Sequence, residues 1–305
     1  MEIAQQKGLG AWLIWATANA GTLAVFGALT RSGLLARHVF DVRAIKALAL
    51  VIQVFCLVIQ LNIINKVIMQ MSGDPLLGYV TATATGVIFT AAMYRNGLLA
   101  AIVAGWYQWA ACMLAIVLIL AVGTFTGAGR VYFPESSSAD LLWGVWSACI
   151  LLAGPIGDVQ HWQRAEAARG SRAYYHGAVL FAVYMLLVLT MAAMEFSLVM
   201  QALLLVAVLC VTSSTIDAIA VAMHEISSKR LGTALALLIC VFWGLFAKVG
   251  VIELWSKAGV YRVVFALIIL AIALIGGKRI EARKDSGIKA NTFGKQRKKA
   301  RGKAD

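Results

Sequence analysis

Apolar runs of about 20 residues recur along this 305-residue chain and constrain its fold more than any other feature. Each run is long enough to cross a hydrocarbon core of ~30 Å as a helix. A backbone in lipid has to satisfy its own hydrogen bonds, so we interpret the runs as helices and not as open strands. Only 13% of the residues are charged, against roughly a quarter in soluble domains. The sequence therefore predicts an all-α integral membrane protein with about nine transmembrane helices, at 9–30, 44–69, 76–94, 97–123, 140–157, 174–194, 197–223, 232–252 and 259–277.

Basic residues gather in alternate loops and above all in the C-terminal segment. Residues 278–305 hold eleven Lys/Arg and three acidic residues, so they carry +8 of the net charge of +13. The positive-inside rule places this segment in the cytoplasm, and nine crossings then place the N-terminus outside. Basic residues assigned to the outer loops are Lys7, Lys66, Arg130, Lys257 and Arg262.

The charge distribution also predicts the domain organisation. We expect a transmembrane domain over residues 1–277 and a basic, disordered tail over residues 278–305, in a multi-pass protein of the cell (inner) membrane. The tail is expected to attract anionic headgroups of the lipid bilayer, and no nucleic acid is expected as a partner.

The predicted fifth helix ends in the sequence Ala153-Gly154-Pro155-Ile156-Gly157-Asp158. Glycine and proline interrupt the hydrogen bonds of a helix and free backbone carbonyls. Interrupted helices are where transporters bind substrates and ions. A plain helix end with a proline kink explains the same residues equally well.

Four consecutive hydroxyl residues, Thr212–Thr215, and a carboxylate at Asp217 lie within the predicted seventh helix. An acidic residue inside a membrane is costly and indicates a functional site. Hydroxyl and carbonyl oxygens are ligands that alkali cations accept. The alternative, about equally weighted, is that the hydroxyls bond to carbonyls of their own helix or to neighbouring helices.

Motifs of common enzyme classes are absent from the sequence. There is no HExxH, no GxSxG, no Walker loop and no dinucleotide fingerprint. The five cysteines form no CxxC pair and no Cys/His cluster, so no metal centre is indicated. We therefore expect no enzymatic activity, no catalytic residue and no cofactor, with Na⁺ as the one ion to consider.

Two segments resemble motifs of the sodium/solute symporter (SSS) family. Asp158–Ala165 is similar to the DQxxWQRA stretch that closes the family's broken sixth core helix. Ser214–Ala218 resembles the STADS segment of its eighth core helix. Gln108 falls where a WTDxxQ segment would end, although Gly105 replaces the aspartate of that segment. The motifs occur in the family's order over nearly the whole apolar region, which implies a LeuT-type fold of two inverted five-helix repeats.

The resemblance also implies site residues and a partner. The implied ion ligands are the backbone of Val211 and the hydroxyls of Ser214 and Thr215. The implied substrate-binding residues are Gly154, Pro155, Asp158, Gln160 and Asp217. The first predicted helix corresponds to core helix two of the family, so core helix one is missing. We therefore expect a small membrane subunit, or a second copy of the chain, to supply a helix.

The functional hypothesis is a membrane transporter, or a transporter subunit, similar to sodium-coupled symporters of small solutes. The solute would bind near the bilayer midplane, between the second, fifth and seventh predicted helices. The alternative is a non-transporting scaffold or sensor built on a degenerate symporter fold. The Ser214/Thr215 pair and Gly154–Pro155 favour the transporter, whereas Gly105 and the missing helix favour the scaffold.

Overall fold

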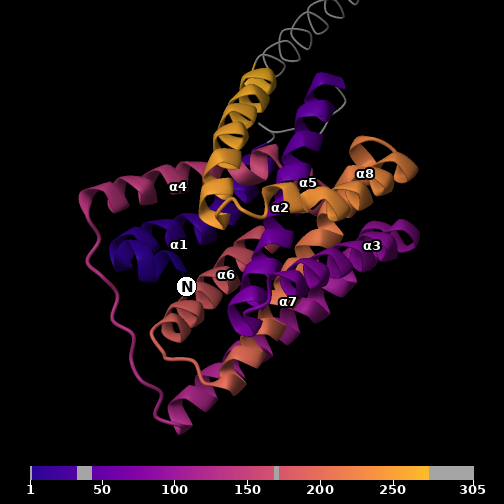
Figure 1. Cartoon of the computed structure of the whole chain (residues 1–305). Helices are drawn as coiled ribbons and strands as arrows, with labels where there is room; N and C mark the ends of the chain where they lie inside the picture. Colours follow the sequence, from indigo (N-terminus) through magenta and orange to yellow (C-terminus); the bar gives the residue numbers. More distant parts are fainter. Residues whose placement is uncertain (1, 33–42, 168–171, 275–305) are drawn as a thin grey trace, which may run out of the picture.

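A computed structural model describes residues 2–32, 43–167 and 172–274 (Figure 1). Their regular structure is helical apart from one isolated β-bridge between Arg130 and Met194. Eight of the described helices are long and apolar enough to cross a membrane. They are α1 (Glu2–Arg31), α2 (Arg43–Ser72), α3 (Pro75–Phe125), α4 (Ser138–Gly157), α6 (Arg172–Ala192), α7 (Leu198–Ile226), α8 (Lys229–Phe242) extended by the 3₁₀ turn η2 (Trp243–Phe246), and a last helix, Val251–Leu274. A short helix, α5 (Val159–Ala167), follows α4. The prediction of an all-α, multi-pass membrane protein is confirmed, while the predicted tail, 278–305, lies outside the described residues.

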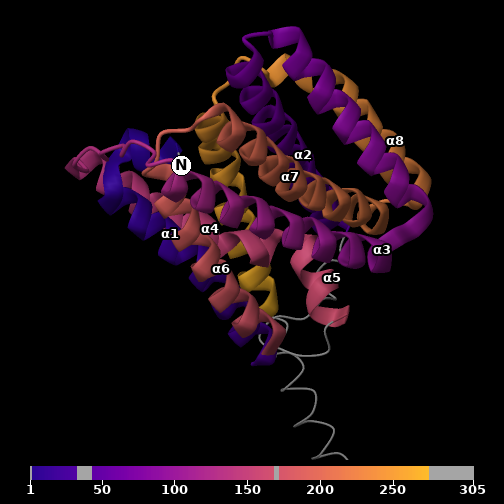
Figure 2. The same cartoon turned by 90° about the horizontal axis from the view of Figure 1, so that it is seen from below.

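Helix α3 contains 51 residues and folds back on itself at Gly97 (Figure 2). A straight helix of that length would measure about 75 Å, far more than a bilayer crossing needs. Gly97 has φ +68° and ψ −162°, a conformation that residues with a side chain rarely adopt. The first arm runs antiparallel to α8, because Tyr79 bonds to the carbonyl of Val241 while Tyr94 lies beneath Lys229.

The second arm of α3 runs antiparallel to α7. Leu98 packs with Ala220 near one end, and Gly123 lies against Met200 near the other. Because α7 and α8 are themselves joined by a tight turn before Lys229, the arms of α3 form a hairpin that faces the α7–α8 hairpin. The predicted helices 76–94 and 97–123 are the two arms of α3, so the eight helices of the described chain correspond to the nine predicted segments.

The helices form two groups, which Figure 2 shows side by side. One group holds α2, α3, α7 and α8, and the other holds α1, α4 and α6. In the second group, Gly144 of α4 lies against the backbone of Ala11, and Thr22 Oγ1 donates to the Leu151 carbonyl at 2.7 Å. The last helix packs on both groups, through Tyr261 against Phe55 of α2 and through other residues against α4.

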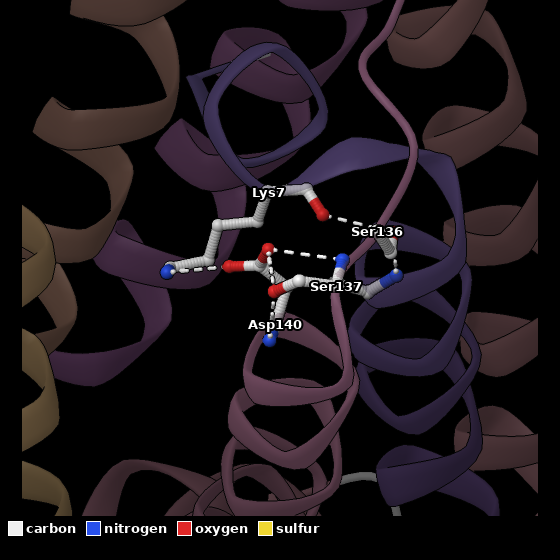
Figure 3. A network of polar contacts seen from close by, with 5 residues as sticks. Lys7, Ser136, Ser137 and Asp140 are labelled. Carbon is white, nitrogen blue, oxygen red and sulfur yellow. Dashed lines mark hydrogen bonds and ion pairs between the residues drawn. The ribbon is translucent and has the colours of Figure 1, made fainter.

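Polar contacts tie the start of α1 to the start of α4 (Figure 3). Lys7 Nζ lies 3.1 Å from Asp140 Oδ1, and Ser136 Oγ donates to the Lys7 carbonyl at 2.8 Å. Ser137 and Asp140 form a capping box at the start of α4. Gly8 has φ +80°, and a side chain at this position would collide with Ser136. The loop before α4 thus holds the N-terminal turn, Glu2–Lys7, in place. Non-helical Gly8 separates this turn from the rest of α1, and the predicted start at residue 9 falls directly after Gly8.

The last two helices differ from the predicted ranges 232–252 and 259–277. Helix α8 begins at Lys229, where Ser228 caps it, and its extension η2 ends at Phe246. Asn62 of α2 donates to the Val249 carbonyl at 2.9 Å inside the break that follows. The assignment of Arg262 to an outer loop was wrong, because it lies within the last helix and contacts Cys56. The break contains Lys248, and the sequence alone did not distinguish a break from a charged residue inside a helix.

Candidate functional site

A cavity of about 560 Å³ lies between α1, α2, α3, α6 and α7. Its size falls in the range of ~300–1,000 Å³ typical of small-molecule pockets. The polar part of its wall comes from α1 and α2 and consists of Glu2, Gln5, Gln6, Gln60, Lys66 and Gln70. The wall formed by α3, α6 and α7 is mostly apolar and includes Cys112, Ile116, Val188, Met191, Leu204 and Val208. We refer to this space as the central cavity.

An ion pair lies in the polar wall of the central cavity. Lys66 Nζ and Glu2 Oε1 are 2.6 Å apart, and Gln6 Nε2 also donates to Glu2 Oε1 at 3.0 Å. Gln5 Nε2 reaches the carbonyl of Ala192 at 3.4 Å, at the end of α6. These contacts hold the N-terminal turn across the ends of α2 and α6, where it forms one wall of the cavity.

The predicted ion ligands lie on the α7 face that is turned toward cavities. Val211 lines the central cavity, and Ser214 and Thr215 line a second cavity of about 220 Å³ together with Trp109 and Tyr184. Val211 and Tyr184 border both cavities. Thr215 Oγ1 donates to the Val211 carbonyl at 3.0 Å, which is the bond to its own helix that we considered as the alternative. The three residues are therefore close together, and the Thr215 hydroxyl oxygen keeps lone pairs for a ligand.

Asp217 belongs to a separate cluster, in the contact between α7 and α3. Its side chain is fully buried, and Gln108 Nε2 donates to its Oδ2 at 3.1 Å. The same Gln108 nitrogen lies 3.1 Å from Ser213 Oγ. Asp217 lines neither of the two cavities described above. It is thus a buried polar centre in the membrane domain and not part of a cavity wall.

The remaining predicted substrate residues lie at the junction of α4 and α5. Helix α4 continues through Pro155 and ends at Gly157, so the break falls at Asp158 and not at the proline. Asp158 Oδ1 accepts from Gln53 Nε2 and from the backbone N–H of Gln160, both at 3.0 Å. Gln160 Nε2 completes the triangle by donating to Gln53 Oε1 at 3.0 Å. We call these three residues the junction cluster.

The helix end at the junction is satisfied within the protein. The Ile156 carbonyl accepts from the indole N–H of Trp162 at 2.9 Å, so this carbonyl has a partner without a ligand. A side chain at Gly154 would meet open space. Asp217 has its hydrogen bond with Gln108 of α3 and none with the junction cluster. The structure therefore places the five predicted substrate residues in two clusters and not around one pocket.

His161 lies beside the junction cluster in α5. Burial lowers the pKa of its imidazole to about 4, against the opposing effect of the Asp158 carboxylate, and Arg164 lowers it further. The Tyr174 hydroxyl donates to the His161 carbonyl at 2.5 Å, and Phe26 packs edge-on against the ring. His161 is therefore a neutral packing residue near pH 7.

Sequence reasoning did not identify four residues as site residues or neighbours of the sites: Gln53, Gln60, Arg262 and Glu2. Gln53 and Gln60 are seven residues apart in one helix and so lie on nearly the same face, which is a signal that polar residues inside a span provide. Arg262 was hidden by its assignment to a loop. Glu2 gave no signal, because it lies before the predicted start of the first helix.

Comparison with known proteins gives no relative to which this site can be referred: no family model matches the chain, and no curated protein or solved structure matches it.

Proposed function

We propose that this protein is a membrane transporter, or the membrane subunit of one, and that it binds a small polar solute in the central cavity. The cavity itself carries the proposal, because it combines about 560 Å³ of space with amide groups and an ion pair on one wall. Glutamine side chains both donate and accept hydrogen bonds, so this wall suits a solute that carries both kinds of group. The apolar opposite wall would exclude water from the remainder of the solute.

The volume of the cavity favours a solute over an inserted helix. A membrane-spanning helix about 10 Å wide and about 30 Å long fills on the order of 2,400 Å³. That exceeds the 560 Å³ of the central cavity several times. The proposed small subunit, or second copy of the chain, would therefore bind against the outside of the bundle.

Sodium is the proposed coupling ion in the symporter-like interpretation. The position of its candidate ligands supports this, because Val211, Ser214 and Thr215 all line cavities. A cation bound there would lie beside the solute cavity, since Val211 borders both spaces. A scaffold or sensor does not need these cavities to open to water. The two interpretations can therefore be distinguished by the access of water-soluble reagents to the central cavity.

Accessibility of single cysteines tests the proposal. The five native cysteines are replaced by alanine, and the variant Thr212→Cys, or separately Gln60→Cys, is reconstituted in vesicles. Alternating access predicts that a membrane-impermeant thiol reagent modifies Thr212→Cys from either face of the membrane. Leu114→Cys is the control, because this side chain is 60% exposed on the outer surface of α3 and would face lipid. Modification of Thr212→Cys from one face only, or from neither, would contradict transport and favour the scaffold or sensor.

A further inference from the structure

We propose that Asp217 binds a proton in the folded protein and that Asp217, Gln108 and Ser213 form a proton site within the membrane domain. The inference goes beyond the transport of a solute, because it depends on the contact between α3 and α7 and on neither cavity. It names a second ion for this protein, distinct from sodium at Ser214 and Thr215.

The hydrogen bonds of the cluster leave two buried acceptors without a donor. Gln108 Nε2 donates to Asp217 Oδ2 and to Ser213 Oγ, both at 3.1 Å. Ser213 directs its own hydroxyl proton to the Cys210 carbonyl at 3.1 Å. Asp217 Oδ1 and Gln108 Oε1 are both buried and receive no hydrogen bond. Buried polar atoms in native proteins are rarely left in this state, so the two orphans indicate a missing group.

A proton on the Asp217 carboxyl group supplies that group. A carboxylate only accepts hydrogen bonds, whereas a carboxylic acid has an O–H donor. The oxygen and nitrogen of a glutamine amide are assigned from their hydrogen-bond network, so the amide of Gln108 can be turned over. Its oxygen then lies 3.1 Å from Asp217 Oδ2 and accepts the acid proton across the same contact. One added proton thus gives Gln108 Oε1 a donor and removes the buried charge, while Oδ1 becomes the carbonyl oxygen of a neutral acid and Nε2 takes the former position of Oε1.

The surroundings of Asp217 offer no positive charge that would stabilise a carboxylate. Among the described residues, Asp217 has no ion pair, and its one side-chain partner is the neutral amide of Gln108. On α7 itself, the nearest titratable residues are Cys210 and His224, each seven residues away and so about 10 Å along the helix. The other elements packed on α7 carry the buried thiols Cys56, Cys112 and Cys240 and the partly buried His161. Among the described residues, Asp217 has no electrostatic partner in the cations of these elements, which are Arg43, Lys46, Lys66, Arg95, Arg164, Lys229 and Arg230.

None of those side chains is a cation that pairs with Asp217. An ionised carboxyl group isolated from water and from counter-ions is so costly that it neutralises instead. A cavity of about 220 Å³ also lies close to the site, because Ser214, one turn before Asp217, lines it. Proton exchange at Asp217 would therefore proceed through the face of α7 that Ser214 shares.

Infrared spectroscopy of the full chain in lipid nanodiscs tests the proposal directly. We expect a carbonyl stretching band of a neutral carboxylic acid at neutral pH. The variant Asp217→Asn should lose the band, and Glu2→Gln, which alters a partly exposed carboxylate, should keep it. Gln108→Leu should shift the band, because the acid loses its hydrogen-bond partner. The shift in Gln108→Leu assigns the band to the cluster even if Asp217→Asn fails to fold.

Sodium distinguishes a proton site from a cation site. The proposal expects the same band in sodium chloride and in choline chloride. Absence of the band from the wild type, or its disappearance when sodium is added, would overturn the proposal, because the orphan oxygens would then hold a cation. The infrared band does not depend on the outcome of the cysteine experiment. Failure of the proposed transport can therefore be distinguished from failure of the proposed proton site.

Discussion

Glu2 and Lys66 form a 2.6 Å ion pair that joins the N-terminal turn of α1 to the second half of α2, in the polar wall of the central cavity. The side chains are 36% and 30% exposed, so water screens the attraction between them. The position of the pair therefore matters more for the shape of the cavity than its strength matters for the stability of the fold.

Removal of this pair should open the cavity without unfolding the protein. We expect Lys66→Ala to lower the free energy of unfolding by less than about 1 kcal/mol. The same change should raise the rate at which a thiol reagent modifies Gln60→Cys, because the N-terminal turn loses a contact. The control is Lys257→Ala, whose pair with Glu253 is more exposed and lies outside the cavity lining. An equal change in the modification rate for both variants would argue against a role of the pair in the cavity.

The turn of the α3 hairpin should be sensitive to a side chain. Gly97 has φ +68° and ψ −162°, so Gly97→Ala should destabilise the protein by about 1–3 kcal/mol, measured by thermal or denaturant unfolding. Gly154→Ala is the matched control, because Gly154 lies in a helix and its added carbon meets open space. Alanine there should be neutral or stabilise by up to about 1 kcal/mol. Similar losses in both variants would contradict the hairpin.

Sodium should stabilise the wild-type protein against heat if Ser214 and Thr215 are ligands, because a ligand that binds only the folded state raises its stability. Ser214→Ala and Thr215→Val should each reduce the increase in melting temperature that sodium produces. Thr190→Val is a close control, since Thr190 also donates to the carbonyl four residues before it, at 3.0 Å, but is exposed and lines neither cavity. A wild type that does not respond to sodium would remove the site from the proposed mechanism.

Acid should destabilise the protein through His161. Burial lowers the pKa of this histidine to about 4 from an ordinary value of 6.5, so between these pH values the unfolded chain binds the proton and the folded chain does not. Stability contributed by the neutral ring is fully present above pH 6.5 and is lost as the pH falls toward 4. We expect a loss of about 3 kcal/mol over this window, and a smaller loss in His161→Gln. The control His176→Gln, at an exposed position, should follow the wild type.

The membrane orientation proposed from charge can be tested with reporter fusions. A reporter inserted after Gly127 and a second one fused after residue 278 should lie in opposite compartments, with the latter in the cytoplasm. Gly127 is preferable to Ser136 or Ser137, because those serines hold the starts of α1 and α4. Reporters found in the same compartment would disprove the nine-pass arrangement.

Hydropathy predicted most of the helices, because each one is a run of apolar residues long enough to cross a membrane and is bounded by polar residues. The hairpin at Gly97 was foreseen as two helices, since arginine and asparagine interrupt the apolar residues before Gly97. The break after Phe246 was not foreseen, because Lys248 was interpreted as a charged residue inside a helix and because Asn62, which donates to the Val249 carbonyl in the break, lies in another helix. Boundaries set by tertiary contacts leave no local pattern in the sequence.

The sequence identified polar residues of the candidate sites but not how they group. Asp217 was recognised as costly in a membrane, and its cluster with Gln108 depends on how two helices pack across 109 residues of sequence. Pro155 attracted attention as a helix breaker, whereas the break falls at Asp158. The Leu151 carbonyl, which lacks an N–H partner at Pro155, accepts from Thr22 Oγ1 instead. Hydrogen-bond partners decide both cases, and one sequence does not reveal them.

Gln108 and Asp217 are 109 residues apart, so they are synthesised and inserted into the membrane at different times. At a synthesis rate of ~5–20 residues per second, Asp217 emerges about 5–20 s after Gln108 has entered the membrane. The second arm of α3 therefore waits in the bilayer with its amide unpaired until α7 is inserted. Slower translation between the two codons should lengthen that interval and expose the nascent chain to quality-control proteases before its hairpins meet.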